Sequence, residues 1–427
     1  MRPAQAPRAL GQVYQLAVGR NLLARPVSRF AVAEVRADFP ALRDGFAYLD
    51  GAAGTQVPEA VIAAISDAYR GGMGNTEGMF PASQRSDQIV EECRRAVADL
   101  VGGSPQGVVL GPNMTTLTYR MARAISKTWR PGDEVVVSQL DHDADIRPWV
   151  QAARDVGARV VWAKVDRDSG ALAWEQYEEL VGERTRLVAV TASSNILGVR
   201  PEVPRITAIA HRSGALTYVD GVHATPHMAV DMGMLGADFY ATSAYKWCGP
   251  HIGAVVAAPE LLETLEPDKL VPSSDDVPDR FELGTPGFAD LAGVTAAVNH
   301  LAGLATGTGT RRDRLLEAMA AVEEYEGELF STMLAGLEQM PHVTLYGRAE
   351  RRAPTAYFNL SGRSADDVAR LLADRGINVW SGDNYAWELV GAIGLRESGG
   401  AVRAGIVHYN NAEDVLRLLQ AVGELKG

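Results

Sequence analysis

Short runs of apolar residues alternate with amphipathic stretches from about residue 46 to residue 258. The runs have the composition of β-strands, and the stretches between them have the spacing of helices. Strands that alternate with helices predict an α/β domain built on a mostly parallel, seven-stranded sheet. The predicted strands are 107–110, 134–138, 159–163, 187–191, 216–220, 239–242 and 253–257, and the predicted helices include 58–70, 85–101, 115–129 and 203–213.

The pattern changes in the last quarter of the chain, where shorter strands and helices follow one long amphipathic stretch. This change predicts a second, smaller α+β domain of about ninety residues, a size that can fold as a unit. After the stretch at 311–340, the predicted strands are 355–360, 378–380 and 402–406, and the predicted helices are 365–375 and 412–425.

These elements divide the chain into four parts. We expect a large domain at 34–310, whose first segment, 34–57, is a candidate for packing against the small domain. The connecting helix is expected at 311–340 and the small domain at 341–427. Residues 1–33 contain five arginines and no acid, which predicts a solvated or partner-docking extension in preference to a targeting peptide.

Composition narrows the class of protein. The chain has 427 residues, 47% of them hydrophobic, and a formal net charge of −12. The acidic balance argues against nucleic acid as a partner, and no apolar run is long enough to span a bilayer. Cys93 and Cys248 lie far apart and form no CxxC motif, so neither a disulfide framework nor a thiolate zinc site is expected. The composition predicts a cytoplasmic protein.

Lysine is rare in this chain, with five lysines among 41 basic residues. Lys246 has the most distinctive setting, because it follows the predicted strand 239–242 and precedes a Gly-Pro turn. The preceding predicted strand ends at Asp220, with His223 close behind it. Pyridoxal phosphate requires an amine for a Schiff base and a carboxylate for its pyridinium nitrogen. The pair therefore predicts a pyridoxal phosphate site.

Several other segments have both a functional and an ordinary structural interpretation. Residues 111–116 follow a strand and open a helix, where backbone N–H groups and the Thr115 hydroxyl can bind phosphate, although a plain helix cap explains the same residues. Asn195 can hydrogen-bond a phenolic ring oxygen or belong to a turn. Residues 281–286 are a turn that can bring a hydroxyl to a phosphate. Arg403 is a candidate for bidentate capture of a carboxylate, or a surface charge.

His142 lies among three acidic residues, Asp141, Asp143 and Asp145. Such a cluster can bind a divalent metal, but its spacing matches no dedicated metal-binding loop. The imidazole could instead lie flat on a cofactor ring. From these residues alone, both interpretations stay open.

Eight short motifs follow one another in an order that is more specific than any one of them. They are Tyr48-Leu49-Asp50, Asn113-Met114-Thr115, Asp141-His142-Asp143-Ala144, Asn195-Ile196-Leu197-Gly198, Asp220-Gly221-Val222-His223, Ser243-Ala244-Tyr245-Lys246, Phe281-Glu282-Leu283-Gly284-Thr285 and Val402-Arg403-Ala404. In this order they resemble the class V aminotransferase family of fold-type I pyridoxal phosphate enzymes, particularly its cysteine desulfurase-like branch. The resemblance runs from about Phe39 to the end of the chain.

The resemblance implies roles for these residues, with no metal in the site. Lys246 would bind the cofactor covalently and move protons, Asp220 would hold the ring nitrogen, and His142 would stack on the ring. Arg403 would bind the carboxylate of an amino-acid substrate. The family's active unit is a homodimer with shared sites. The remaining cofactor contacts implied are Met114, Thr115, Asn195, His223, Ser243, Tyr245 and, contributed by the other subunit, Thr285.

The loop at 379–386 departs from the family pattern, which in cysteine desulfurases reads Thr-Gly-His-His-Cys-Ala. Tyr385 takes the place of the sulfur-accepting cysteine, and Trp380 takes that of a common arginine. Asp145 likewise stands where asparagine is frequent. Because neither cysteine of the chain lies in such a loop, an enzyme-bound persulfide is not expected. Trp380, Asn384 and Tyr385 are candidates for substrate contacts, and Tyr385 can donate a proton.

The expected activity is that of a C–S lyase acting on a cysteine S-conjugate in specialised metabolism. It follows by similarity to the desulfurase-like pair of lincosamide antibiotic biosynthesis, which act by C–S lysis or by decarboxylation-dependent oxidative deamination. Decarboxylation-dependent oxidative deamination, transamination and epimerisation stay open as alternatives. A retired scaffold that only binds ligands is the non-enzyme alternative. The joint presence of Lys246, Asp220 and Arg403 argues against it, because a binding protein needs no Schiff-base lysine.

Overall fold

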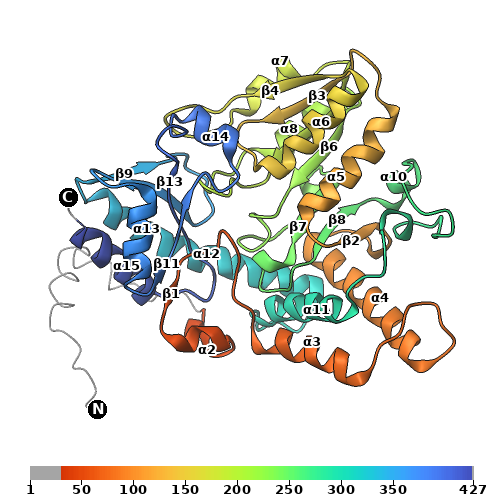
Figure 1. Ribbon diagram of the computed structural model, residues 1–427, viewed down its shortest axis with the longest axis horizontal. Coiled ribbons are helices and arrows are strands. Elements are labelled where there is room, and N and C mark those ends of the chain that lie inside the picture. The colour runs from red at the N-terminus through yellow and green to blue at the C-terminus, as the bar shows by residue number, and fades with distance from the viewer. Residues whose placement is uncertain (1–29, 426–427) are drawn as a thin grey trace.

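A seven-stranded sheet forms the centre of the larger part of the molecule, seen in a computed structural model that describes residues 30–425 (Figure 1). The strand order is β2-β8-β7-β6-β5-β3-β4. Strand β8 runs in the opposite direction to the other six strands, which are parallel. The mostly parallel sheet expected from the sequence is confirmed, with small shifts at some strand ends. The strands are β2 (Val108–Gly111), β3 (Glu134–Ser138), β4 (Arg159–Ala163), β5 (Thr185–Thr191), β6 (Leu216–Asp220), β7 (Phe239–Ser243) and β8 (Gly253–Ala257).

Successive residues of each strand enter two different hydrophobic cores, because side chains alternate between the two faces of a sheet. In β3, Val135 and Val137 join one core and Val136 joins the other. Helices α5 and α6 cover the first core, and α4, α8 and α11 cover the second. Their bounds are α4 (Pro81–Val101), α5 (Met114–Ile125), α6 (Arg147–Val156), α8 (Val203–Arg212) and α11 (Phe288–Gly303).

Helix α11 was not predicted from the hydrophobic pattern. It packs against α3 (Glu59–Gly71), α4 and α12 (Arg311–Glu338), and its buried residues include Leu291, Val294 and Val298. A helix that is apolar on most sides has no polar stripe, so the amphipathic period that identifies other helices is missing.

A smaller unit with an antiparallel sheet follows α12. Its sheet has the order β12-β13-β10-β9, and its core includes Phe330 of α12 and Phe358 of β10. The single strand predicted at 378–380 is wrong, because the chain there forms two short strands that pair in different sheets. The elements are β9 (Val343–Tyr346), β10 (Thr355–Leu360), α13 (Ala365–Ala373), β11 (Ile377–Asn378), β12 (Trp380–Gly382), α14 (Trp387–Ala392), β13 (Ala401–Gly405) and α15 (Ala412–Glu424).

The first described segment packs against this smaller unit. Strand β1 (Ala47–Tyr48) pairs in parallel with β11, and α2 (Val32–Ala37) lies nearby in Figure 1. Arg36 of α2 forms an ion pair of 2.9 Å with Asp414 of α15. Most of the predicted extension at 1–33 lies outside the described residues. No helix within residues 30–425 has the length and apolar character needed to cross a membrane.

Strand β8 passes so close to the start of α5 that only glycine fits at position 253. A Cβ atom there would lie 2.3 Å from the carbonyl carbon of Asn113 and 2.4 Å from the nitrogen of Met114. We expect Gly253→Ala to lower the free energy of unfolding by about 1–3 kcal/mol, because the start of the helix must shift. Urea unfolding measures the loss. Gly182→Ala, where no atom lies within 4 Å, is the control. Equal losses in the two variants would contradict the close approach.

Candidate active site

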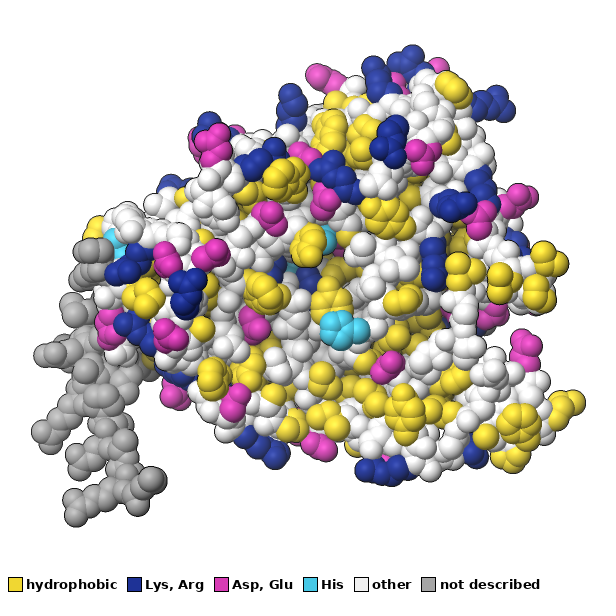
Figure 2. Space-filling view, in the orientation of Figure 1, with side chains coloured by type: hydrophobic (Ala, Val, Ile, Leu, Met, Phe, Trp, Pro, Cys, Tyr) yellow, Lys and Arg dark blue, Asp and Glu magenta, His cyan; other side chains and the backbone are white. Residues whose placement is uncertain are grey.

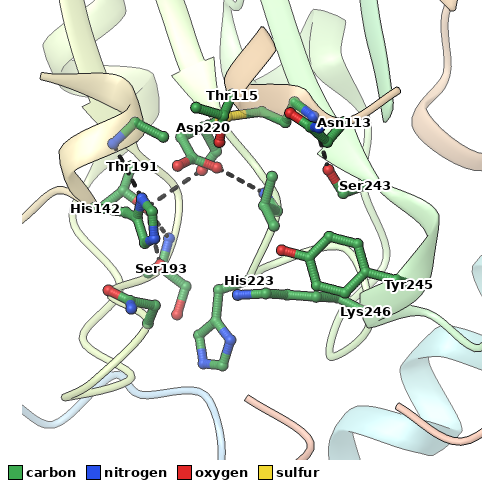
Figure 3. Close-up of a pocket in the computed structure, with 14 residues that line it drawn as sticks. Asn113, Thr115, His142, Thr191, Ser193, Asp220, His223, Ser243, Tyr245 and Lys246 are labelled. Carbon is green, nitrogen blue, oxygen red and sulfur yellow. Dashed lines mark hydrogen bonds between the residues drawn. The ribbon is translucent and has the colours of Figure 1, made fainter. Parts of the chain in front are cut away.

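A pocket lies at the edge of the large sheet where β3, β5, β6 and β7 end (Figure 3). Parallel strands bring their carboxyl ends to the same edge, so the loops that leave them line a common crevice. The lining residues are Asn113, Met114, Thr115, His142, Ala144, Thr191, Ser193, Asn195, Asp220, Val222, His223, Ser243, Tyr245 and Lys246.

One end of the pocket is formed by the start of α5. The Asn113 side chain accepts the N–H of Thr116 at 2.8 Å, so Asn113 is a true helix cap. The Ser243 hydroxyl accepts the N–H of Met114 at 3.0 Å and ties the helix to the end of β7. A helix N-terminus carries partial positive charge, and Thr115 adds a hydroxyl. This end of the pocket therefore suits a phosphate group.

Two buried charges face the pocket (Figure 3): Asp220 is 4% exposed and Lys246 is 5% exposed. The N–H of Val222 donates to Asp220 Oδ1 at 2.9 Å. Burial raises the pKa of Asp220 to about 6. Burial, followed by the charge of Arg403, lowers the pKa of Lys246 to about 7. A large share of the Lys246 amine is therefore neutral, and able to attack an aldehyde, at neutral pH.

Arg403 reaches the adjoining cleft from β13 of the smaller unit. Its side chain is 4% exposed, and its Nη1 donates to the carbonyl oxygen of Asn195 at 3.1 Å. Burial lowers the pKa of Arg403 to about 10, and Asp50 is close enough to oppose this shift. Within residues 30–425, none of Arg403, Lys246 and Asp220 forms a salt bridge. A buried cation without a carboxylate partner has donors available for an anionic ligand.

Three uncharged side chains complete the wall. His142 Nδ1 accepts the N–H of Ala144 at 3.0 Å, and burial, followed by the charge of Lys246, lowers the pKa of His142 to about 3. His223 Nε2 lies 3.0 Å from the Thr355 hydroxyl, while its Nδ1 has no partner among the described residues. Asn195 Oδ1 also has none. These two unpartnered atoms can hydrogen-bond a bound molecule.

The loop between β12 and α14 lies over the cleft. Asn384 and Tyr385 both have left-handed backbone, with φ of 50° and 61°. Contacts on both sides hold this strained conformation. Asn195 Nδ2 donates to the Asn384 carbonyl at 2.8 Å, and the N–H of Asp143 donates to the Tyr385 carbonyl at 2.7 Å. The Tyr385 ring stacks on His142 with 5.5 Å between centroids. The cleft beneath has a volume of about 1270 Å³.

The structure brings nearly all the site residues expected from the sequence to this pocket or cleft, including Trp380, Asn384 and Tyr385. Thr285 is the exception, because it is exposed and lines neither space in its own chain. Sequence reasoning missed Thr191 and Ser193, which the rule of strand ends could have identified. Other missed residues come from helices and loops without a local signal: Tyr119, Arg147, His251, Trp387 and Arg396.

The acidic residues near His142 do not gather around its imidazole. Asp141 and Asp145 are fully buried and line neither the pocket nor the cleft. In the described part of the chain, no group of three His, Cys, Asp or Glu side chains is placed to hold a metal ion. Of the two interpretations of this segment, the arrangement favours the one in which His142 faces a cofactor ring.

A buried amine, a buried carboxylate and the start of a helix thus share one pocket. Pyridoxal phosphate has an aldehyde, a pyridine nitrogen and a phosphate, and Lys246, Asp220 and α5 offer a matching group for each. The fold and the pocket together define an α/β, fold-type I pyridoxal phosphate enzyme. The chain belongs to the class-V aminotransferase family, which matches residues 47–418.

Known proteins similar to this chain agree with that assignment. An uncharacterized protein, MT3887, of Mycobacterium tuberculosis is 36% identical over 93% of this chain and 99% of its own. A probable cysteine desulfurase of Pseudomonas aeruginosa is 34% identical over 91% and 96%. The cysteine desulfurase structure from Thermococcus onnurineus NA1 has a TM-score of 0.84 at 29% identity, covering 92% and 97%. A structure with glycine covalently linked to its pyridoxal phosphate shares the fold at a TM-score of 0.76 and 19% identity, covering 91% and 99%.

Lys246 should capture the cofactor with a pH dependence set by its lowered pKa. We expect the capture rate of cofactor-free protein to rise with pH through about 7 and then level off, because only the neutral amine attacks the aldehyde. Absorbance follows the rate, and borohydride reduction with peptide mapping locates the label. A label on Lys127 or Lys269, or a rate that still rises near the ordinary lysine pKa of 10.5, would contradict the assignment.

Proposed function

We propose that the protein cleaves the C–S bond of a cysteine S-conjugate by β-elimination. The observation that carries this proposal is the buried guanidinium of Arg403, which has no salt bridge within residues 30–425 and shares a cleft with Lys246. A carboxylate held by Arg403 would place an α-amino acid beside the lysine. The rest of the cleft, bordered by Trp380, Tyr385 and Trp387, has room for a bulky substituent on sulfur.

The chain's own groups suffice for the proton transfers of this reaction. Pyridoxal phosphate, when bound, supplies the electron sink that stabilises negative charge at the substrate Cα. Lys246 takes the Cα proton in its neutral form. The C–S bond then breaks, and the sulfur leaves with the bonding electrons as a thiolate that takes up a proton. The remaining aminoacrylate reacts with water to give pyruvate and ammonium, so no oxidant or reductant is needed.

Tyr385 supports elimination over persulfide transfer. A phenol can donate a hydrogen bond or a proton, but it cannot hold sulfur as a persulfide. Cys93 and Cys248 are buried, neither lines the pocket or the cleft, and burial raises the pKa of Cys248 to about 12. We infer that this protein differs from its relatives named cysteine desulfurase and releases the sulfur as an intact thiol.

The active unit that we propose is a homodimer in which Thr285 completes the partner's phosphate site. Thr285 is exposed and lies outside the pocket of its own chain. Exposed hydrophobic residues on α3 and just before α4 support an interface, because such patches mark binding surfaces. Figure 2 shows hydrophobic side chains gathered over this region, and the residues are Ile62, Tyr69, Met79 and Phe80.

A panel of cysteine S-conjugates tests the reaction. The expected products are a thiol, pyruvate and ammonium in equal amounts, identified by mass. Replacing both Cys93 and Cys248 by Ala should leave the yield unchanged, whereas Tyr385→Phe should lower kcat/KM by roughly 10²-fold if the phenol donates a proton. A persulfide trapped on either cysteine would overturn the proposal. The proposal would also be overturned by a product that keeps the C–S bond, whether it is a keto acid, an aldehyde or an amino acid with inverted configuration.

Mixed dimers test the shared sites. Lys246→Ala and Thr285→Ala chains should each be impaired, and hybrids of the two should contain one site with both lesions and one with neither. After subunit exchange in an equal mixture, half of the dimers are hybrids, so activity should recover to about a quarter of the parent value. Mass spectrometry of the intact dimers verifies exchange. Proven hybrids with no recovered activity would show that each site is built from one chain.

A further inference from the structure

A pair of buried carboxyl groups, Asp141 and Asp145, lies in the core close to Asp220. Both side chains are completely buried. The Ser138 hydroxyl donates to Asp141 Oδ2, and Trp149 Nε1 donates to Asp145 Oδ1 at 3.1 Å. The other oxygen of each carboxyl group has no donor among the described residues. The two carboxyl groups lie within hydrogen-bonding reach of each other.

The pair has no ion-pair partner among the residues that the structure describes. The titratable groups that act on the pair are the Tyr177 and Tyr218 phenols and the Asp220 carboxyl group. None of these supplies a cation. Two adjacent carboxylates cannot both ionise in a dry interior, so at least one must keep its proton.

Asp220 has a different environment, because it lines the pocket and is 4% exposed. It accepts the N–H of Val222, and the charge of Lys246 lowers its pKa against the effect of burial. Burial raises the pKa of Asp220 to about 6 and that of Asp141 to about 8, and burial together with the charge of Asp141 raises the pKa of Asp145 well above its usual range. Asp220 is therefore the first of the three to lose its proton.

We propose that Asp145 is a neutral carboxylic acid in the folded protein and donates its proton in a hydrogen bond to Asp141. This hydrogen bond gives a partner to the two carboxyl oxygens that otherwise lack one. Asp145 acts as a positioning residue, because it touches neither the pocket nor the cleft.

Protonation of Asp145 affects the charge of Asp220, the carboxyl group that lines the pocket. A second ionised carboxylate near Asp220 would raise the pKa of Asp220 further. With Asp145 protonated, the pair carries one negative charge fewer, so it raises the pKa of Asp220 less than two carboxylates would. The protonation state of Asp145 does not depend on which reaction the enzyme catalyses, so failure of the proposed function would leave this proposal untouched.

Infrared spectroscopy of protein with and without pyridoxal phosphate tests this assignment. At mildly alkaline pH, ordinary aspartates are ionised, because their pKa is about 3.9. We expect a carbonyl band of a neutral carboxylic acid that shifts when the protein is made with carboxyl-¹³C aspartate. Asp145→Asn keeps a hydrogen-bond donor but should remove this band. Asp155→Asn, at an exposed position, is the matched control and should keep it.

Asp141→Asn identifies which residue holds the proton. The band should persist in this variant at a shifted frequency, because the acceptor changes from a carboxyl group to an amide. Absence of a ¹³C-sensitive acid band in the parent protein would overturn the proposal, as would a band that survives in Asp145→Asn. Loss of the band in Asp141→Asn would place the proton on Asp141 and also overturn it. If Asp145→Asn does not fold, the spectra of the parent protein and of Asp141→Asn still show whether Asp145 holds the proton.

Discussion

The burial of three charged groups without ion-pair partners is the constraint on which this site depends. Taking an ion out of water costs several kcal/mol unless another group compensates it. Lys246, Asp220 and Arg403 are each no more than 5% exposed, and none forms a salt bridge within residues 30–425. The pKa shifts of all three side chains have burial as their largest cause. Pyridoxal phosphate offers an aldehyde to Lys246 and a pyridine nitrogen to Asp220, and under the proposed function a substrate carboxylate would pair with Arg403.

The fold can hold these charges because their backbones belong to rigid elements. Asp220 ends β6, Lys246 follows β7, and Arg403 lies within β13, so burial of the surrounding strands fixes where each side chain begins. Arg403 comes from the smaller unit, whereas the other two come from the large sheet. The separation of Arg403 from Lys246 is therefore set by how the two units meet. The bridge between Asp50 and Gly405 is one contact that helps to hold the first segment against β13.

The residues that fit the cofactor and the residues on which the proposed reaction depends lie in different parts of this chain. The groups that fit the cofactor lie on the sheet and at the start of α5, within a fold that resembles solved cysteine desulfurases over 92% of the chain. The loop that carries Tyr385 borders the cleft. Ala386 beside it is buried in the large sheet's core, whereas Tyr385 itself is 72% exposed. Under the proposed function, a phenol at position 385 would exclude transfer of sulfur to this loop while leaving the scaffold unchanged. A shared fold and cofactor are therefore compatible with a different fate for the substrate.

The sequence alone determined the features that depend on local pattern. Apolar runs identified the strands, because a short valine-rich run such as that around Val136 is typical of a strand buried on both faces of a parallel sheet. Lys246 and Asp220 were identifiable because the ends of parallel strands meet at one edge, whatever the details of packing. Family likeness added the remaining site residues, and the structure brings all of them together apart from Thr285.

Only the tertiary structure decided the features that depend on contacts between distant segments. Helix α11 is apolar on most sides because other helices surround it, and the 378–380 stretch is split because its ends pair with different strands. Asn195 supports the Asn384 carbonyl, 189 positions away. The closeness of Asp141 and Asp145 to Asp220 likewise follows from the pairing order of β3, β5 and β6. The burial and the electrostatic environment of these positions depend on neighbours from distant parts of the chain. A local sequence pattern does not contain those neighbours.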